Sequence, residues 1–131
     1  MLSSSYSTAV QPDHLVLSSG ISAALSILAK GIVGGPGSVV LVENNTYFLA
    51  GNIFKEVVPI DEEGLIPDEL ESILRREKVS ALYTIPVHHN PQGTVMSVGR
   101  QKAVMELAVK YDFLVISDEP YGLLHYEDVS K

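Results

Sequence analysis

Short apolar runs of strand length alternate along this chain with segments whose apolar residues recur at helical spacing. The runs predicted to be strands are residues 14–17 (HLVL), 38–43 (SVVLVE), 56–60 (EVVPI), 79–85 (VSALYTI) and 113–117 (FLVIS). The segments predicted to be helices are residues 20–30, 46–54, a helix that begins at Pro67, and 98–111, with a turn at 34–37. Strands joined by helices favour the α/β class, so we expect three layers, with a mostly parallel sheet between helices.

Polar residues are not spread evenly over the predicted loops. The loops that enter strands hold ordinary turn and solvent residues. The loops that leave strands hold clusters of Ser, Asn, Tyr, His and Asp, at residues 18–22, 44–47, 88–93 and 118–121. Ligands of open parallel sheets bind beyond the carboxyl ends of the strands, so these four clusters predict a binding site at that edge.

Each cluster also has an explanation that needs no ligand. Ser18 or Ser19 is a suitable N-cap for the following helix. An aromatic residue such as Tyr47 often packs in a core, and residues 90–93 form a turn by composition alone. Asp118 ends a very apolar strand, which would partly bury its charge and require a partner, although acids there often cap helices.

The bulk composition is that of a single soluble globular domain. The chain has 131 residues, 46% hydrophobic and 19% charged, with a net charge of −7 and no Cys. The negative charge disfavours nucleic acid and anionic membranes as partners, and the missing Cys excludes disulfides, thiolate nucleophiles and Cys-based zinc sites. We therefore expect a cytoplasmic protein.

Two other site types are disfavoured. Residues 113–119 (FLVISDE) resemble the magnesium-binding strand of P-loop NTPases, but no Gly is followed by Lys, as a phosphate loop requires. His88 and His89 could be joined by Asp118 around a metal, but adjacent His side chains on an extended segment rarely reach one ion. We expect no metal site.

Taken together, the four clusters resemble those of fold-type I pyridoxal-phosphate (PLP) enzymes, the class I/II aminotransferases. The similarity runs from about residue 12 to about residue 128. The matching segments are the phosphate loop and helix at 17–25, the strand and loop VVLVENNTY at 39–47, the acidic turn DEEGLIPDEL at 61–70, HNPQG at 89–93 and DEPY at 118–121. In HNPQG, Gln92 replaces the usual Thr, and Asn45 replaces a usual Pro.

The resemblance implies a role for six residues. Asp118 would hold the proton on the pyridine nitrogen of PLP, Tyr121 and Asn90 would bond its phenolic oxygen, and Tyr47 would stack on its ring. The backbone amides of Ile21 and Ser22, with the Ser22 hydroxyl, would hold the phosphate at a helix N-terminus. The substrates would be an amino acid and a 2-oxo acid.

The resemblance also implies parts that the sequence does not contain. The family's Schiff-base lysine lies beyond the acid-tyrosine loop in a Ser-x-x-Lys setting, whereas none of the six lysines here has Ser three residues before it. We expect residues 1–131 to be a partial large, PLP-binding domain that lacks the N-terminal arm, the lysine segment and the small domain of a homodimeric parent. A non-catalytic PLP-binding or interaction module and a piece of a related PLP lyase are the alternatives.

The implied sheet has a further consequence. In this family two later strands lie between the first strand and the fifth. Residues 14–17 would then have no neighbour in their native place, and residues 113–117 would form an unpaired apolar edge, which promotes association. We therefore expect the chain alone to aggregate, to dimerise through its fifth strand, or to be partly molten.

The purified 131-residue chain is expected not to transaminate, because covalent catalysis on PLP needs a lysine that the sequence does not supply. The measurement is a coupled assay with a panel of amino acids and 2-oxo acid acceptors in saturating PLP. Turnover above a PLP-only blank with any pair would contradict the expectation.

Overall fold

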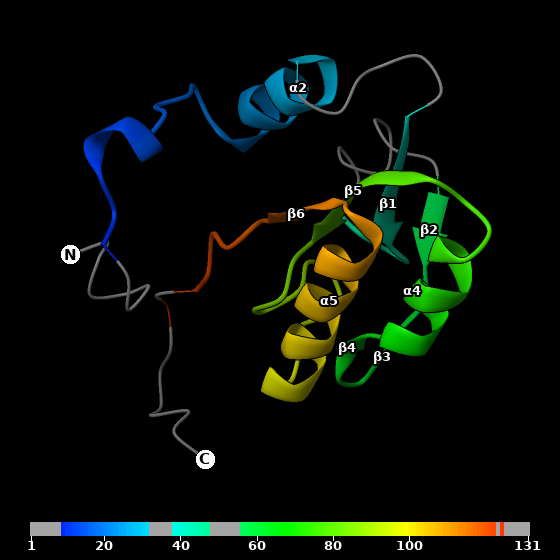
Figure 1. Ribbon diagram of the computed structural model, residues 1–131. Helices are drawn as coiled ribbons and strands as arrows, with labels where there is room; N and C mark the ends of the chain where they lie inside the picture. Colours follow the sequence, from blue (N-terminus) through cyan, green and yellow to red (C-terminus); the bar gives the residue numbers. More distant parts are fainter. Residues whose placement is uncertain (1–8, 32–37, 48–55, 123, 125–131) are drawn as a thin grey trace.

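A parallel sheet forms the centre of the molecule. The computed structural model describes residues 9–31, 38–47, 56–122 and 124. Its main sheet has four strands in the order β2 (Glu56–Val58), β1 (Val39–Glu43), β5 (Val79–Thr84) and β6 (Leu114–Ser117), and every pairing is parallel (Figure 1). This arrangement confirms the predicted α/β class with a mostly parallel sheet.

Helices cover both faces of this sheet. Helix α2 (Ile21–Gly31) packs on one face through Leu25, which joins Val42 and Tyr83 in a buried cluster. Helices α4 (Pro67–Leu74) and α5 (Val98–Tyr111) cover the other face, where Leu41 and Leu82 are buried. Because successive strand residues point to opposite faces, β1 and β5 each supply both layers of the core.

Local signals explain where the two covering helices begin and end. Pro67 occupies the first turn of α4, where its missing N–H costs nothing. The Ser97 side chain accepts a bond from the Arg100 amide at the start of α5, and Asp112 ends that helix in a left-handed conformation with φ 54°. Both helices confirm the sequence-based expectation.

The predicted strand at residues 14–17 is wrong. A single 3-10 turn, η1 (Pro12–His14), precedes an extended segment in which Leu15, Val16 and Leu17 are 50%, 87% and 100% exposed. A strand needs a hydrogen-bonded neighbour, and neither edge of the described sheet, β2 or β6, pairs with this segment. The apolar run therefore has the composition of a strand, but it does not form one because no neighbouring strand pairs with it in the described sheet.

The segment predicted as one strand at 56–60 is divided at Pro59, which has no N–H to donate to a ladder. Strand β3 (Ile60–Asp61) instead pairs antiparallel with β4 (Gly64–Leu65), a hairpin that the sequence analysis missed. Gly64 has φ 86°, and a Cβ there would lie 3.3 Å from the Met96 Cα. That close approach explains why a glycine ends the hairpin turn.

Two further expectations concern the long connections. Thr46 and Tyr47 are not helical, so the predicted helix does not begin there, and the rest of it, residues 48–55, lies outside the described residues. The predicted turn at 34–37 lies outside them as well.

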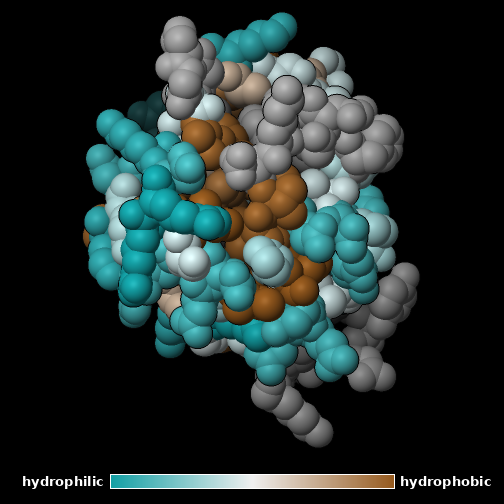
Figure 2. Space-filling model, turned by 90° about the vertical axis from the view of Figure 1, so that its right-hand side faces the viewer, coloured by the Kyte–Doolittle hydropathy of each residue, from teal (hydrophilic) through white to brown (hydrophobic). Residues whose placement is uncertain are grey.

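Exposed apolar side chains remain at both edges of the described sheet. Val57 of β2 is 47% exposed and Leu114 of β6 is 51% exposed. Figure 2, which views the side where β2 and α4 lie, shows apolar residues gathered at the centre of that face within a hydrophilic border. Strand β6 is an edge of the described sheet, as predicted, with apolar residues and free ladder positions on one side.

The substitution Leu114→Lys is expected to weaken self-association of the chain about tenfold, since it removes apolar area and adds a charge at a sheet edge. Sedimentation velocity at several concentrations measures the effect. Met105→Lys is the matched control, because Met105 is 54% exposed on α5 and not on the edge. Equal effects of the two substitutions would show that association does not proceed through β6.

Candidate functional site

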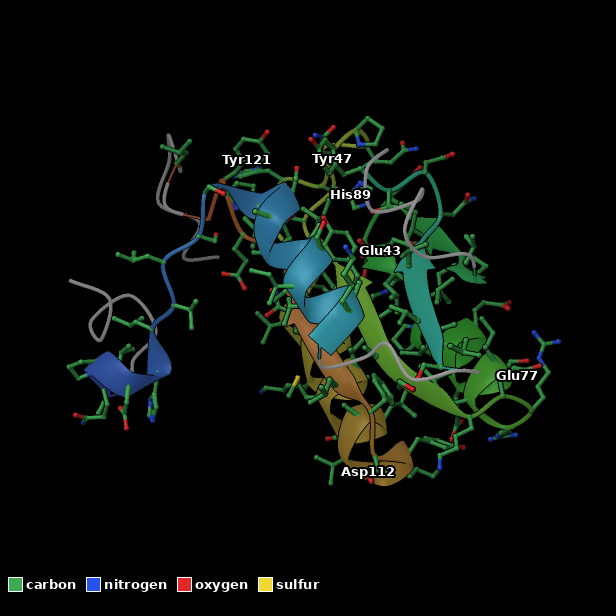
Figure 3. The ribbon with its side chains drawn as sticks, turned by 90° about the horizontal axis from the view of Figure 1, so that it is seen from above. Glu43, Tyr47, Glu77, His89, Asp112 and Tyr121 are labelled. Carbon is green, nitrogen blue, oxygen red and sulfur yellow. The ribbon has the colours of Figure 1, made fainter. Side chains whose placement is uncertain are left out.

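The polar loops that leave the strands gather at one end of the molecule. Figure 3 shows this separation, with Glu43, Tyr47, His89 and Tyr121 at one end of the strands and Glu77 and Asp112 at the other. Glu77 and Asp112 belong to loops that enter strands. The arrangement follows from the parallel sheet, which brings all carboxyl ends to one edge.

A small pocket of about 180 Å³ lies at this edge. The residues that line it come from four separate loops and are Ile21, Tyr47, Ile85, Asn90, Asp118, Pro120 and Tyr121. Five of the six residues predicted from the sequence are among them. The sixth, Ser22, follows Ile21 in the first turn of α2 and does not line the pocket.

Asp118 is held by two hydrogen bonds. Its backbone amide donates to the Thr84 carbonyl at 2.9 Å, which continues the β5–β6 ladder by one step. Its Oδ2 accepts a bond from the Tyr83 hydroxyl at 2.6 Å. Burial, together with the bond to Asp118, raises the pKa of Tyr83 well above its usual range, so its phenol remains a donor at neutral pH.

Glu119 points elsewhere, although it follows Asp118 directly. Its Oε1 accepts a bond from the Ser117 hydroxyl at 2.5 Å. Its side chain lines a different pocket, together with Val104 and Met105 of α5. Consecutive residues of an extended segment face opposite ways, so only the first of the two acids reaches the strand-end pocket.

Glu43 is a buried acid that the sequence analysis did not single out. Its side chain is 1% exposed at the end of β1. Oε1 accepts a bond from the Thr84 hydroxyl at 2.7 Å, and Oε2 accepts one from the Ile85 amide at 2.8 Å. The sequence did offer a signal, which is the position of a Glu at the end of the apolar run 38–43. A carboxylate buried there must be hydrogen-bonded, so it indicates specific partners nearby.

The loop after β5 is a closed turn. The His89 amide donates to the Thr94 carbonyl at 2.9 Å, and the Gly93 amide donates to the His89 carbonyl at 2.6 Å. The Asn90–Pro91 peptide bond is cis, and Gly93 has φ 72°. Within this turn His89 is buried and Asn90 faces the strand-end pocket.

Tyr47 takes part in both the core and the pocket. It is partly buried and packs against the cluster formed by Leu25, Val42 and Tyr83. It also lines the strand-end pocket. The Thr46 amide, next to it, donates to the Glu43 carbonyl at 3.2 Å. Packing and ligand contact are thus compatible for this side chain.

The N-terminus of α2 borders the same pocket. Ile21 is 42% exposed and Ser22 is exposed. Ser18 does not cap the helix in the expected way, because its hydroxyl donates to the Gly20 carbonyl at 3.2 Å. The first amides of a helix have no partner within it and carry partial positive charge, so this end of α2 suits an anion.

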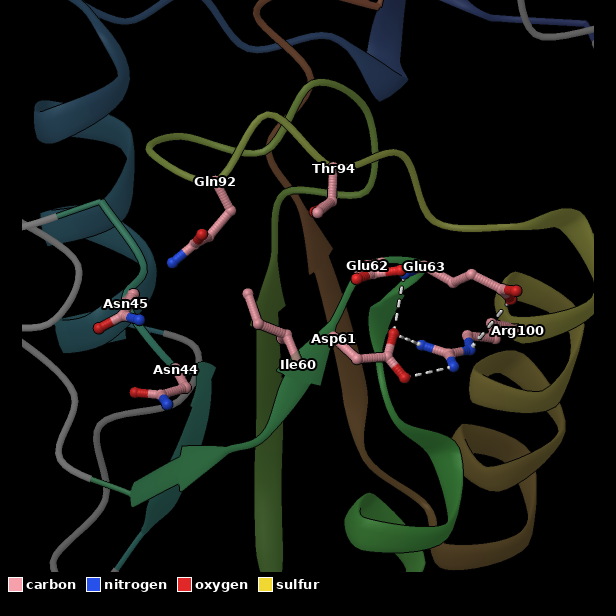
Figure 4. Close-up of a pocket in the computed structure, with 9 residues that line it drawn as sticks. All are labelled: Asn44, Asn45, Ile60, Asp61, Glu62, Glu63, Gln92, Thr94 and Arg100. Carbon is pink, nitrogen blue, oxygen red and sulfur yellow. Dashed lines mark hydrogen bonds and ion pairs between the residues drawn. The ribbon is translucent and has the colours of Figure 1, made fainter.

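A larger hollow, of about 560 Å³, shares no lining residue with the strand-end pocket. Figure 4 shows the side chains that line it. Arg100 dominates it but is already engaged, donating to Asp61 Oδ2 at 2.7 Å and to the Gly64 carbonyl at 2.8 Å. The hydrogen bond from Arg100 lowers the pKa of Asp61. We attribute a structural role to Arg100, because its guanidinium holds the β3–β4 hairpin against α5, and we propose no ligand for this hollow.

A parallel sheet with helices on both faces defines an α/β protein, and its pocket lies at the carboxyl edge, where open parallel sheets bind ligands. The sequence matches the family described as aminotransferase class I and II over residues 1–130. This match covers nearly the whole chain. The protein belongs to the aminotransferase class I and II family.

Individual relatives agree with that assignment. The chain is 35% identical over 132 residues to aromatic-amino-acid aminotransferase 1 of Thermococcus litoralis, covering 92% of this chain and 31% of that protein. It is 33% identical over 125 residues to YisV, an uncharacterized HTH-type transcriptional regulator of Bacillus subtilis, covering 91% and 26%. The crystal structure of Pyrococcus horikoshii kynurenine aminotransferase with PMP superposes with a TM-score of 0.73 at 36% identity, covering 79% and 28%.

The chain therefore spans less than a third of the length of these relatives. The 31% coverage of the T. litoralis protein is the largest of the three. Among the described residues, no helix combines the length and apolar character that crossing a bilayer requires.

Tyr83→Phe is expected to lower the free energy of unfolding by about 1–2 kcal/mol at pH 7, because it removes a donor to an acid. Since the folded-state pKa of Tyr83 is raised, its contribution is complete below the unfolded value and declines at higher pH. Urea unfolding of both proteins should thus show a difference that shrinks above about pH 10. A constant difference across that range would contradict the raised pKa.

Proposed function

We propose that the chain forms the PLP-binding part of an aminotransferase, which moves an amino group between an amino acid and a 2-oxo acid. The observation that carries the proposal is the pocket at the strand ends, where residues from four distant loops meet in a member of the aminotransferase class I and II family. Solved relatives support the cofactor, since the P. horikoshii kynurenine aminotransferase structure contains PMP.

The residues present fit such a cofactor. A pyridine ring with a protonated nitrogen needs a carboxylate at its edge, and Asp118 is held there by Tyr83. Because Tyr83 donates to one oxygen, the Asp118 carboxylate is held in a fixed orientation. In our proposal the other oxygen keeps the proton on the ring nitrogen. When bound, PLP supplies an electron sink for bonds broken at the amino acid's α-carbon.

For the remaining predicted residues we propose the roles that the family resemblance implies. The Tyr47 ring stacks on the cofactor ring, and its packing against the core keeps it in place. The Asn90 amide and the Tyr121 hydroxyl bond the phenolic oxygen. The amides of Ile21 and Ser22, with the Ser22 hydroxyl, bind the phosphate at the N-terminus of α2.

The whole protein extends beyond this chain in our proposal. Residues 1–131 would be part of the large domain of a cytoplasmic homodimer, whose lysine segment and small domain complete the site. Coverage of only 31% of the T. litoralis aminotransferase supports a larger parent. The acidic, cysteine-free composition suits the cytoplasm, and no nucleic acid or membrane partner is proposed.

A second candidate is a non-catalytic module that binds PLP or another protein. The similarity to the B. subtilis protein YisV, over 91% of this chain, supports this second candidate, because YisV is named as a transcriptional regulator and not as an aminotransferase. A related PLP lyase would use the same pocket. A parent protein with a Ser-x-x-Lys segment and transamination activity would support the first proposal, and one without that lysine would support the module.

PMP binding tests the proposed pocket, because PMP has no aldehyde and cannot react with surface lysines. The chain is expected to bind PMP saturably below about 1 mM. Asp118→Ala should weaken binding about tenfold or more, since it removes a charge-assisted hydrogen bond. Glu119→Ala is the matched control and should stay near wild-type, because Glu119 lines a different pocket.

Calorimetric titration and the dichroism induced in the PMP absorption band measure both effects. Circular dichroism in the far ultraviolet first establishes that each variant is folded. Equal losses of PMP affinity in the two variants would show that Asp118 is the wrong carboxylate for the proposed role. Absence of saturable PMP binding by the folded wild-type chain would overturn the proposed cofactor site.

A further inference from the structure

Two buried side chains join two of the loops that line the strand-end pocket. Glu43 ends β1 at the root of the loop that leads to Tyr47, and His89 lies at the root of the turn that carries Asn90. Glu43 Oε2 and His89 Nε2 are 3.2 Å apart, and both side chains are 1% exposed. The proposed cofactor roles involve neither residue.

The surroundings of the imidazole ring orient it toward Glu43. His89 Nδ1 accepts a long bond from the Gln92 amide at 3.4 Å, which leaves the ring proton on Nε2. That Nε2 forms no hydrogen bond among the described residues, and the nearest carboxylate oxygen, Glu43 Oε2, lies 3.2 Å away, within ion-pair distance. The ring therefore spans the gap between the turn and the carboxylate, touching the turn with one nitrogen and facing Glu43 with the other.

The carboxylate in turn is fixed to the sheet. Thr84 and Ile85 donate to its two oxygens at 2.7 and 2.8 Å. The backbone of Glu43 also accepts the Thr46 amide, one residue before Tyr47. Displacement of Glu43 would thus shift the turn that contains His89, and displacement of His89 would shift the loop that leads to Tyr47.

We propose that Glu43 and His89 form a positioning pair that holds the Tyr47 loop and the Asn90 turn at a fixed separation. The reference to a cofactor rests on the proposed function, whereas the coupling of the two loops does not. A core that needed only packing would be served as well or better by apolar residues, since a buried polar pair costs desolvation. The pair instead transmits position between loops far apart in the sequence.

Amide hydrogen exchange of the cofactor-free chain tests the coupling directly. His89→Leu removes the ring nitrogens and leaves Glu43 buried with one partner fewer. It should raise exchange about tenfold or more at the Gln92, Gly93 and Thr46 amides, the cost expected when a buried polar partner is lost. His89→Gln should restore slow exchange, because its amide group both donates and accepts.

Val104→Ala is the matched control for general loss of stability. Val104 is 3% exposed on the core-facing side of α5 and lines no part of the strand-end pocket. Its truncation should raise exchange throughout the sheet and not selectively in the two loops. Rates in His89→Leu are therefore compared with those of Val104→Ala at the same residues. If His89→Leu does not fold, Glu43→Gln carries the same comparison, because it keeps the side chain's shape.

Coupling requires that a change at His89 reaches Thr46, in the other loop. Faster exchange confined to residues 89–94, or an increase no larger than that of Val104→Ala, would overturn the positioning pair. Failure of His89→Gln to restore slow exchange would overturn it as well.

PMP affinity supplies the second readout. If the pocket binds PMP, His89→Leu should weaken binding about tenfold and His89→Gln should recover it. Absence of PMP binding by the wild-type chain would overturn the proposed function and leave the exchange result to decide the positioning pair. Unchanged PMP affinity in His89→Leu, with wild-type binding intact, would overturn the pair's effect on the pocket.

Discussion

The hydrogen bonds to the buried carboxylate of Glu43 are the interaction on which the strand-end side of this molecule depends. The carboxylate lies at the carboxyl end of β1, buried from water, and its oxygens accept bonds from Thr84, the last residue of β5, and from Ile85, which follows it. A buried acid is tolerated only when such donors surround it. Backbone pairing aligns the strands along their length, and this carboxylate joins their ends, where the chain leaves the sheet for the pocket.

A second bond of the same kind joins the other side of β5. Tyr83 donates to Asp118, so β5 is tied to β1 through Thr84 and to β6 through Tyr83. Strand β5 thus places its hydrogen-bonding Tyr83 and Thr84 at its carboxyl end, while Leu82 and Val79 remain in the apolar core. The residues that fix the strand ends and the residues that line the pocket are thus close neighbours, so a chain of 131 residues can hold the pocket together.

Much of this organisation could be predicted from the sequence, and the failures have physical causes. The helix at 67–74 was found because Pro67 marks its start, and the helix at 98–111 was found because its apolar residues recur at helical spacing. The run at 14–17 has strand composition but no neighbour to pair with, a property that composition cannot express. Asp118 and Asn90 were visible as polar residues in loops. Glu43 and Tyr83 could not be identified in this way, because both belong to strands and their roles depend on hydrogen bonds to residues from other parts of the sheet.

The alternation of Leu82 and Tyr83 on β5 also makes the sheet intolerant of misalignment. Val42 lies beside Tyr83 and Tyr83 beside Ile116, so the phenol enters the α2 layer and reaches Asp118 at the strand end. A slip of one residue would exchange the two layers, carrying a hydroxyl into the apolar space beneath α4 and α5 and a leucine toward the carboxylate. The hydrogen bond from Tyr83 to Asp118 therefore also selects the strand register, because it is formed in one alignment of the strands and lost in an alignment shifted by one residue.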